Sequence, residues 1–371
     1  MVLEQTPPLE DLKSSIENPS TSIGKRMRAA YYLKQLHSSS SQEQFRNDIV
    51  TILGSQLFNK QHGSLMRHEF AYVLGQMKDE SACVYLERQL LKEQDCVMVR
   101  HECAEALGAI GSETSRSCLE QCIKQNPDTP ELADTARLAL NVMDWRQNPQ
   151  SQEENDFPVA CACMLNPYSS IDPAPPHPSH QNMTPQELGA ILANSDLPMF
   201  DRYRAMFSLR NIGGDACVLE LSNVLVNDTS SALLRHEVAY VLGQLQHSAS
   251  IPFLIKSLQR EDEHVMVRHE SAEALGAIPD EWETTIEPIL KQYSQDKDPA
   301  VAESCLVALD AADYWGTTTH TTQDDEDSET AAVPPLSFVQ QKNASTTSTS
   351  SSCAAAAPNR STMNGHFNVK A

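Results

Sequence analysis

The sequence predicts an all-α protein, an α-solenoid of eight helix pairs arranged as two duplicated halves of four. Three observations predict it: a long internal duplication, a shorter repeat of 33 residues inside each half, and apolar residues at helical spacing within each repeat. The sequence contains no segment with the sustained two-residue alternation that indicates strands. Helix pairs that recur at such a period and stack in register form a solenoid.

The duplication relates residues 66–110 to residues 234–278. The two stretches share 25 identical residues in 45 aligned positions without a gap, at a constant offset of 168 residues. Within each half, a His-Glu dipeptide recurs after 33 residues. Similar sequence lies one period upstream and one period downstream of these two repeats, so we expect four repeats in each half.

Each repeat is expected to contain one helix that faces a core and a second helix that covers it. Phe70, Val73, Leu74 and Met77 have the spacing i, i+3, i+4, i+7, which is the apolar stripe of a helix buried on one side. A second helix is predicted between successive stripes, for example at residues 82–91. The pair forms the repeating unit.

Composition changes divide the chain into four parts. A cluster of prolines interrupts the repeats, and the last part of the chain is rich in Thr, Ser and Ala with an acidic run. We therefore expect an N-terminal half at 1–145, a Pro-rich linker at 146–183, a C-terminal half at 184–315 and a disordered tail at 316–371.

The charge balance limits the partners that the protein can have. Fifty acidic residues against 28 basic ones give a formal net charge of −22. Such a balance excludes a nucleic-acid binder, which needs a basic face, and favours a cationic ligand or a basic protein partner. The sequence has no visible signal peptide and no apolar run of membrane-spanning length. We expect a cytoplasmic monomer, with the nucleus as a second compartment and no membrane contact.

Four His-Glu dipeptides stand at equivalent helix positions, about opposite the apolar stripe, and should line one inner surface of the solenoid. They occur only in the two central repeats of each half, whereas the apolar pattern continues through all four repeats. Packing does not explain that restriction, so a functional role is favoured. The dipeptides are His68-Glu69, His101-Glu102, His236-Glu237 and His269-Glu270.

Imidazole and carboxylate together are ligands for non-haem iron, manganese or zinc, and the lack of nearby thiolates argues against a structural zinc site. Each half offers enough for one metal bound by two His and one Glu, and the duplication then implies a dinuclear centre. One Glu per half remains, to bridge the metals, to orient a histidine or to bind a cationic substrate group. Glycines seven residues after each His serve close helix packing or leave room for a ligand; they are Gly75, Gly108, Gly243 and Gly276.

The motifs RHE-x-AYVLGQ and VMVRHE-x-AEALGAI, present in two halves of four HEAT-like repeats, resemble the deoxyhypusine hydroxylase family over roughly residues 20–315. The resemblance implies a di-iron monooxygenase. Such an enzyme would use O2 and an external reductant to hydroxylate the deoxyhypusine side chain of translation initiation factor 5A, which gives hypusine. Hydroxylation of an unactivated C–H bond requires an oxidant derived from O2, which favours iron over zinc.

On this basis we assign two ligand sets and two substrate residues. The set for one iron is His68, His101 and Glu102, and the set for the other is His236, His269 and Glu270. Glu69 and Glu237 are left for the substrate amine or as additional metal ligands. Two other interpretations stay open: a non-enzymatic HEAT-repeat scaffold that binds a protein on its concave face, and a hydrolase with two zinc or manganese ions.

Overall fold

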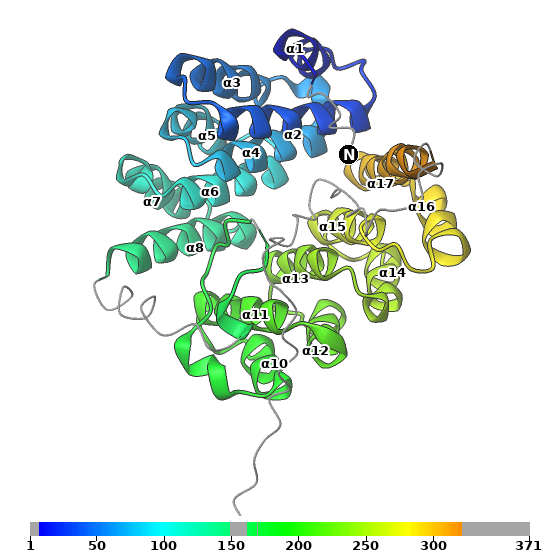
Figure 1. The fold of residues 1–371 in the computed structure, drawn as a ribbon. Coiled ribbons are helices and arrows are strands. Elements are labelled where there is room, and N and C mark those ends of the chain that lie inside the picture. Colours follow the sequence, from blue (N-terminus) through cyan, green and yellow to red (C-terminus); the bar gives the residue numbers. More distant parts are fainter. Residues whose placement is uncertain (1–6, 149–161, 169, 321–371) are drawn as a thin grey trace, which may run out of the picture.

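The computed structural model describes residues 7–148, 162–168 and 170–320. Within these ranges it contains sixteen α-helices and no strand, and the helices follow one another as eight pairs, four in each half. The predicted fold class is confirmed. Inner helices of successive pairs pack directly against one another and outer helices cover them (Figure 1).

The inner helices carry the His-Glu dipeptides and the apolar stripes. They are α2 (Ile23–Ser39), α4 (Gly63–Met77), α6 (Val97–Ile110), α8 (Pro130–Gln147), α11 (Met199–Ile212), α13 (Ala232–Leu245), α15 (Val265–Gly276) and α17 (Pro299–His320). The outer helices are α1 (Leu9–Glu17), α3 (Glu43–Gln56), α5 (Cys83–Leu90), α7 (Arg116–Gln125), α10 (Pro185–Ala193), α12 (Gly214–Asn227), α14 (Ile251–Gln259) and α16 (Glu287–Tyr293).

Short helical turns connect many of these helices. Six are 3₁₀ turns and one, just before α16, is a π-helical turn. They are η1 (Lys60–His62), η2 (Glu80–Ala82), η3 (Glu113–Ser115), η4 (Ala162–Met164), η5 (Pro178–Asn182), η6 (Ser248–Ser250) and η7 (Trp282–Ile286).

The apolar stripe predicted for α4 forms part of the core. Phe70, Val73 and Leu74 are completely buried, and Met77 is 8% exposed. Burying an aliphatic or aromatic side chain of this size contributes about 1.5–3 kcal/mol relative to leaving it in water. The hydrophobic contacts between neighbouring pairs therefore hold the solenoid together, because each repeat buries its apolar side against the next one.

The glycines of the inner helices permit close helix packing. A Cβ atom added at Gly75 would lie 2.7 Å from the Cα atom of Ala106 in the next inner helix. Gly108 meets Ala139 in the same way, with 2.8 Å to its Cα atom. Gly243 and Gly276 also contact alanines of the following inner helix. Of the two roles considered from the sequence, close packing is the one that the structure supports.

The two halves touch at both of their ends, so the first and last inner helices are neighbours. Helix α8 packs against α11 and α13, while α17 packs against α2 and α4 (Figure 1). At the second junction Arg28 makes an ion pair with Asp310, and Gly24 lies against the same carboxylate. The inner helices of both halves consequently surround one central region.

The observed helix ends differ slightly from the expected part boundaries. Helix α8 extends to Gln147, inside the expected linker, and α17 extends to His320, beyond the expected start of the tail. Residues 162–168 and 170–183 of the linker pack onto the second half; Cys163 and Ala174 are completely buried. The remainder of the tail, 321–371, lies outside the described residues.

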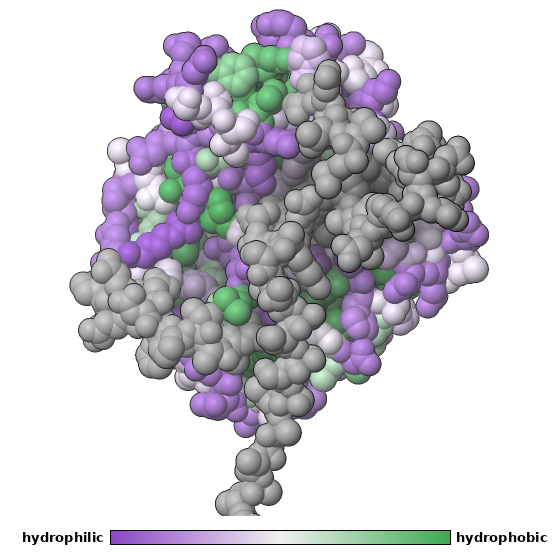
Figure 2. Space-filling model, in the orientation of Figure 1, coloured by the Kyte–Doolittle hydropathy of each residue, from purple (hydrophilic) through white to green (hydrophobic). Residues whose placement is uncertain are grey.

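The described surface seen in Figure 2 is mainly hydrophilic, with small hydrophobic areas between hydrophilic ones. This agrees with the large excess of acidic residues in the composition. Within the described ranges, no helix combines the length and the apolar character that a membrane span requires.

Candidate metal centre

The arginine before each His-Glu dipeptide anchors the helix that carries it. Arg67, Arg100 and Arg268 each donate from Nε to the carbonyl oxygen ten residues earlier, at the end of the preceding outer helix. These bonds satisfy carbonyl groups that a helix end leaves without an intrahelical partner. Arg67 also makes a bidentate ion pair with Asp95, at 2.8 and 2.9 Å. Each anchor fixes its inner helix and therefore the position of the histidine that follows.

The four histidines of the motifs come together at the centre of the molecule, although they belong to four helices in two halves. Within each half the ring centroids of His68 and His101, and of His236 and His269, are 5.4 Å apart. Between the halves the distances are 5.3 Å for His68 and His269, and 5.2 Å for His101 and His236. The imidazoles thus form one cluster to which both halves contribute equally.

The cluster is buried, which the sequence analysis did not expect of a polar helix face. His101 and His269 are completely buried, while His68 and His236 are 4% and 5% exposed. The polar face of each inner helix is covered because the opposite half packs against it. An isolated half would expose this face, and a helical pattern read along one half does not show what covers it.

The four glutamates of the motifs are also buried, at 0–3% exposure, and lie around the imidazoles. His68 Nε2 lies 3.0 Å from Glu102 Oε2, and the equivalent pair in the second half, His236 Nε2 and Glu270 Oε2, is 3.5 Å apart. In each half, therefore, the first imidazole faces the glutamate of the next repeat.

The remaining two glutamates are placed differently. Glu69 Oε1 lies 3.2 Å from Nδ1 of its neighbour His68, and Glu69 Oε2 accepts a hydrogen bond from the Tyr31 hydroxyl at 3.2 Å. Glu237 lines the central cavity together with Glu69. These two carboxylates come from equivalent positions, and both are turned toward the cavity.

Several buried polar atoms of the cluster have no hydrogen-bond partner in the described part of the chain. Both ring nitrogens of His101, His236 and His269 are in this state, as are one carboxylate oxygen of Glu270 and one of Glu273. Buried polar groups are normally satisfied, since leaving them unpaired costs free energy. Imidazole nitrogens and carboxylate oxygens converging in a dry site are the donor set of a metal centre.

The ligand atoms are close enough together to bind a metal ion. In three groups the possible ligand atoms all lie within 4.8 Å of one another. One group belongs to the first half, one joins the halves through three imidazoles, and one belongs to the second half. They are His68, His101 and Glu102; His68, His236 and His269; and His269, Glu270 and Glu273.

Burial and mutual repulsion shift the acid–base equilibria of this cluster. Burial, reinforced by the neighbouring imidazoles, lowers the pKa of His101 and of His269 well below the usual value, so both are neutral and able to coordinate. Burial and the nearby carboxylates raise the pKa of Glu237 well above its usual range. For His68 burial lowers the pKa, but the carboxylates of Glu102 and Glu69 outweigh it and raise the pKa. A bound cation would relieve this accumulation of carboxylates.

Some residues of the site were not singled out from the sequence. Glu105 and Glu273 follow His101 and His269 by four residues; both are buried, and their pKa values are raised mainly by burial. Tyr72 and Tyr240 follow the other two histidines by four residues and line the cavity. A signal existed, because residues at i+4 share a helix face and each pair is spaced by the duplication offset.

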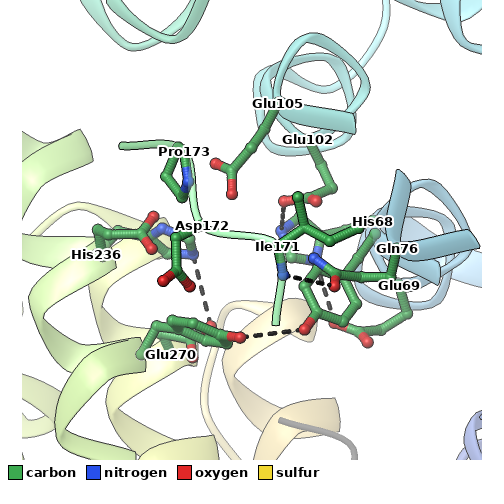
Figure 3. Close-up of a pocket in the computed structure, with 13 residues that line it drawn as sticks. His68, Glu69, Gln76, Glu102, Glu105, Ile171, Asp172, Pro173, His236 and Glu270 are labelled. Carbon is green, nitrogen blue, oxygen red and sulfur yellow. Dashed lines mark hydrogen bonds and ion pairs between the residues drawn. The ribbon is translucent and has the colours of Figure 1, made fainter. Parts of the chain in front are cut away.

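A cavity opens beside the cluster (Figure 3). Its empty volume is about 420 Å³, including the part that opens to solvent, and six carboxylates line it. Both halves contribute to the lining, as does the segment between the halves through Ile171, Asp172 and Pro173. The acidic residues of the lining are Glu69, Glu102, Glu105, Asp172, Glu237 and Glu270. This arrangement can bind a slender cationic group next to a metal centre.

Family models match both halves of the chain. A model described as HEAT repeats matches residues 50–141 and 218–310, and one described as a PBS lyase HEAT-like repeat matches residues 201–227. These matches agree with the observed helix pairs and with the duplication of the sequence.

Characterised relatives carry one name throughout. The chain is 42% identical to deoxyhypusine hydroxylase of Dictyostelium discoideum, over 83% of this chain and 89% of the relative. It is 41% identical to the Danio rerio protein of that name, over 81% and 90% of the two chains. The solved structure of human deoxyhypusine hydroxylase in complex with glycerol matches with a TM-score of 0.69 and 37% identity, covering 82% of this chain and 96% of the human one. The chain belongs to the deoxyhypusine hydroxylase family, and the expectation that it is an enzyme of this type is confirmed.

Proposed function

We propose that this chain is a di-iron monooxygenase that uses O2 and an external reductant to hydroxylate the deoxyhypusine side chain of translation initiation factor 5A. The observation that carries the proposal is the cluster of four buried imidazoles surrounded by buried carboxylates, in which three imidazoles have no partner on either ring nitrogen. A family of hydroxylases and a metal-ligand cluster of this composition point to the same chemistry.

Two sets of residues would hold the metal ions. His68, His101 and Glu102 would hold one iron, and the equivalent residues His236, His269 and Glu270 would hold the other. The short distances from the first imidazole of each half to the glutamate of the next repeat support this division. Iron bound there would supply the redox chemistry with O2 that hydroxylation of an unactivated C–H bond requires.

Glu69 and Glu237 would bind the substrate amine. Deoxyhypusine is a long, slender side chain that carries ammonium groups, and the cavity beside the cluster is narrow and acidic. The Tyr31 hydroxyl holds one oxygen of Glu69 in place, and the other oxygen lies 3.2 Å from His68. A carboxylate held in this way would fix the substrate chain relative to the imidazoles.

The burial of the cluster serves this reaction. With the four histidines at most 5% exposed, bulk water is excluded from the reacting region. Exclusion of water strengthens the charge interactions inside the site and protects reactive species from side reactions. A docking face of a non-enzymatic scaffold would instead present its repeated residues to solvent, so the burial argues against that alternative.

Metal analysis combined with an activity assay tests the proposal. Purified full-length protein should contain about two irons per chain and convert a deoxyhypusine-containing factor to the hypusine form only when O2 and a reductant are present. The added oxygen is measured by mass spectrometry of the substrate. Full activity with one metal or none would refute the dinuclear centre. Activity with zinc or manganese in the absence of O2 would show that the site is a hydrolase.

A further inference from the structure

A short stretch of the segment between the halves crosses the cavity beside the imidazole cluster. We call Ser170–Pro173 the strap. Ile171, Asp172 and Pro173 line the cavity, and Figure 3 shows them facing His68 and Glu102 on one side and His236 and Glu270 on the other. Ser170 is 8% exposed. The strap belongs to no helix pair, yet it forms part of the cavity wall.

The strap is tied to α11 by an ion pair. Both terminal nitrogens of Arg210 donate to Asp172, at 2.8 Å to Oδ1 and 2.6 Å to Oδ2. The Arg210 side chain is completely buried, and its guanidinium stacks over the rings of Tyr168 and Phe207 at 5.0 and 4.7 Å. Such a planar, bidentate and stacked arrangement fixes direction as well as distance.

Two glutamines at equivalent positions of the two halves hold the strap from opposite sides. Gln76 Oε1 accepts the backbone N–H of Ile171 at 3.1 Å. Gln244 Nε2 donates to Ser170 Oγ at 3.1 Å, and Gln244 Oε1 accepts from Arg210 at 3.0 Å. Because the two glutamines lie on the inner helices α4 and α13, the strap is positioned relative to the histidines of both halves.

The carboxylate of Asp172 is fully occupied by these contacts. Besides the two bonds from Arg210, it accepts from the Ser170 hydroxyl at 2.8 Å and from the Asn166 amide at 3.1 Å. Its charge is compensated by the guanidinium, unlike that of Glu237, beside which no cation lies among the described residues. Asp172 therefore serves to hold the strap rather than to bind a substrate ammonium group.

We propose that Arg210, acting through Asp172, is a positioning residue for the hydroxylation: it holds the strap as a fixed wall that keeps a long polyamine-like side chain aligned with the metal ligands. The inference rests on the proposed function for its substrate. Small displacements of a bound substrate reduce turnover strongly, so a wall of fixed position matters for rate and binding.

A double-mutant cycle on the iron-loaded full-length protein tests this role. The variants are Asp172→Asn, Arg210→Lys and the combination of both. Each single variant should raise KM and the dissociation constant for spermidine, the polyamine used as a probe, by roughly tenfold. The double variant should have about the same effect as either single one, because both break the same contact. Iron content should remain as in the wild type.

The matched control is Arg202→Lys on the same helix. Arg202 is also a buried arginine bound to an aspartate, since it donates to Asp228 at 2.6 Å, but it does not touch the strap. This variant should lower the melting temperature while leaving KM and spermidine binding unchanged. Hydrogen exchange should be faster in the strap for the Arg210 and Asp172 variants only. An equal effect of Arg202→Lys on KM would overturn the proposal.

A direct role of Asp172 in binding the ammonium group gives the opposite sign for one variant. Weakening the Arg210 contact would then free the carboxylate, so Arg210→Lys would bind spermidine more tightly, and the effects of the two single changes would not coincide. That outcome refutes the positioning role. If the wild-type protein does not hydroxylate deoxyhypusine, the proposed function fails, while spermidine affinity and hydrogen exchange still decide whether Arg210 holds the strap.

Discussion

Tyr72 and Tyr240 meet across the boundary between the two halves, with their hydroxyl oxygens 3.1 Å apart. Their positions differ by the duplication offset of 168 residues. Gln244 Nε2 donates to the Tyr240 oxygen at 3.0 Å, so the tyrosine pair is connected to the residue that also holds the strap. Equivalent residues of the two halves are therefore in direct contact next to the imidazole cluster.

The first prediction concerns this contact. Tyr72→Phe removes a hydrogen bond between the halves without changing the ring, so it should reduce the free energy of unfolding by about 1 kcal/mol. Calorimetry or thermal melting measures the change. The control is Tyr85→Phe, whose hydroxyl makes an exposed bond to Thr51 at 3.4 Å and should matter little. Equal melting temperatures for Tyr72→Phe and wild type would contradict the prediction.

The second prediction separates the two kinds of glutamate. Glu69→Gln should keep the iron but weaken substrate binding roughly ten- to a hundredfold, because a charged hydrogen bond to an ammonium group contributes about 1.5–3 kcal/mol. Glu102→Gln should lose iron first, since Glu102 lies 3.0 Å from His68 Nε2. Iron content and substrate affinity are measured for both variants. Equal loss of iron in the two variants would show that both glutamates are ligands.

The third prediction concerns cooperation between the halves. His101 is completely buried, and its ring lies 5.2 Å from that of His236 in the other half. His101→Ala should therefore abolish turnover although the second half keeps all its ligands. Half of the wild-type activity would instead indicate two independent metal sites. His247→Ala is the control, because this histidine pairs with the exposed Asp215 on the surface.

A fourth prediction concerns removal of the metals. The ligands come from α4, α6, α13 and α15, so bound metal joins the two halves. Chelation should lower the melting temperature, because a ligand present at a thousandfold its dissociation constant stabilises the folded state by about 4 kcal/mol. His101→Ala should show a much smaller response to the chelator. A melting temperature that does not depend on the chelator in the wild type would rule out a metal contribution to stability.

The fifth prediction is a pH dependence of stability outside the metal cluster. Hydrogen bonds from Arg202, the Ser231 N–H and Ser230 outweigh the effect of burial and lower the pKa of Asp228. A lowered carboxylate pKa contributes stability that is present above the unfolded value near 4 and is lost as the pH falls through the folded value. The loss should therefore begin only below about pH 4.

Comparison with Asp228→Asn isolates this contribution. At neutral pH the variant should be less stable by roughly 3 kcal/mol, because a buried arginine loses its charged partner. The difference from wild type should shrink in acid, when Asp228 of the wild type becomes protonated. Glu113→Gln, at an exposed ion pair with Arg116, should show only a small difference at any pH. A constant difference for Asp228→Asn across the pH range contradicts the assignment.

Much of the fold was predictable because the repeats are copies of one another. The stripe of Phe70, Val73 and Leu74 recurs in the other repeats, so its helical period could be recognised several times in one sequence. The His-Glu dipeptides were noticed for a related reason: they interrupt this regularity by occurring only in the central repeats. Repetition made both the architecture and the candidate ligands visible.

The strap and the burial of the site could not be predicted in the same way. The contact between Arg210 and Asp172 joins a helix to a segment without periodicity, and nothing in the spacing of these residues indicates that they meet. The proline-rich composition suggested a spacer between the halves. Likewise, the burial of His101 depends on the packing of one half against the other, which the pattern within a single half does not show.

The closed arrangement of the two halves has a consequence for the order in which the centre is made. His236 follows His68 by 168 residues, so at a synthesis rate of about 5–20 residues per second the later ligands emerge roughly 10–30 s after the earlier ones. The contact of Arg28 with Asp310 spans 282 residues and forms later still. A newly made first half therefore waits with two imidazoles and two carboxylates uncovered. The complete set of ligands exists only after the last helices reach the first.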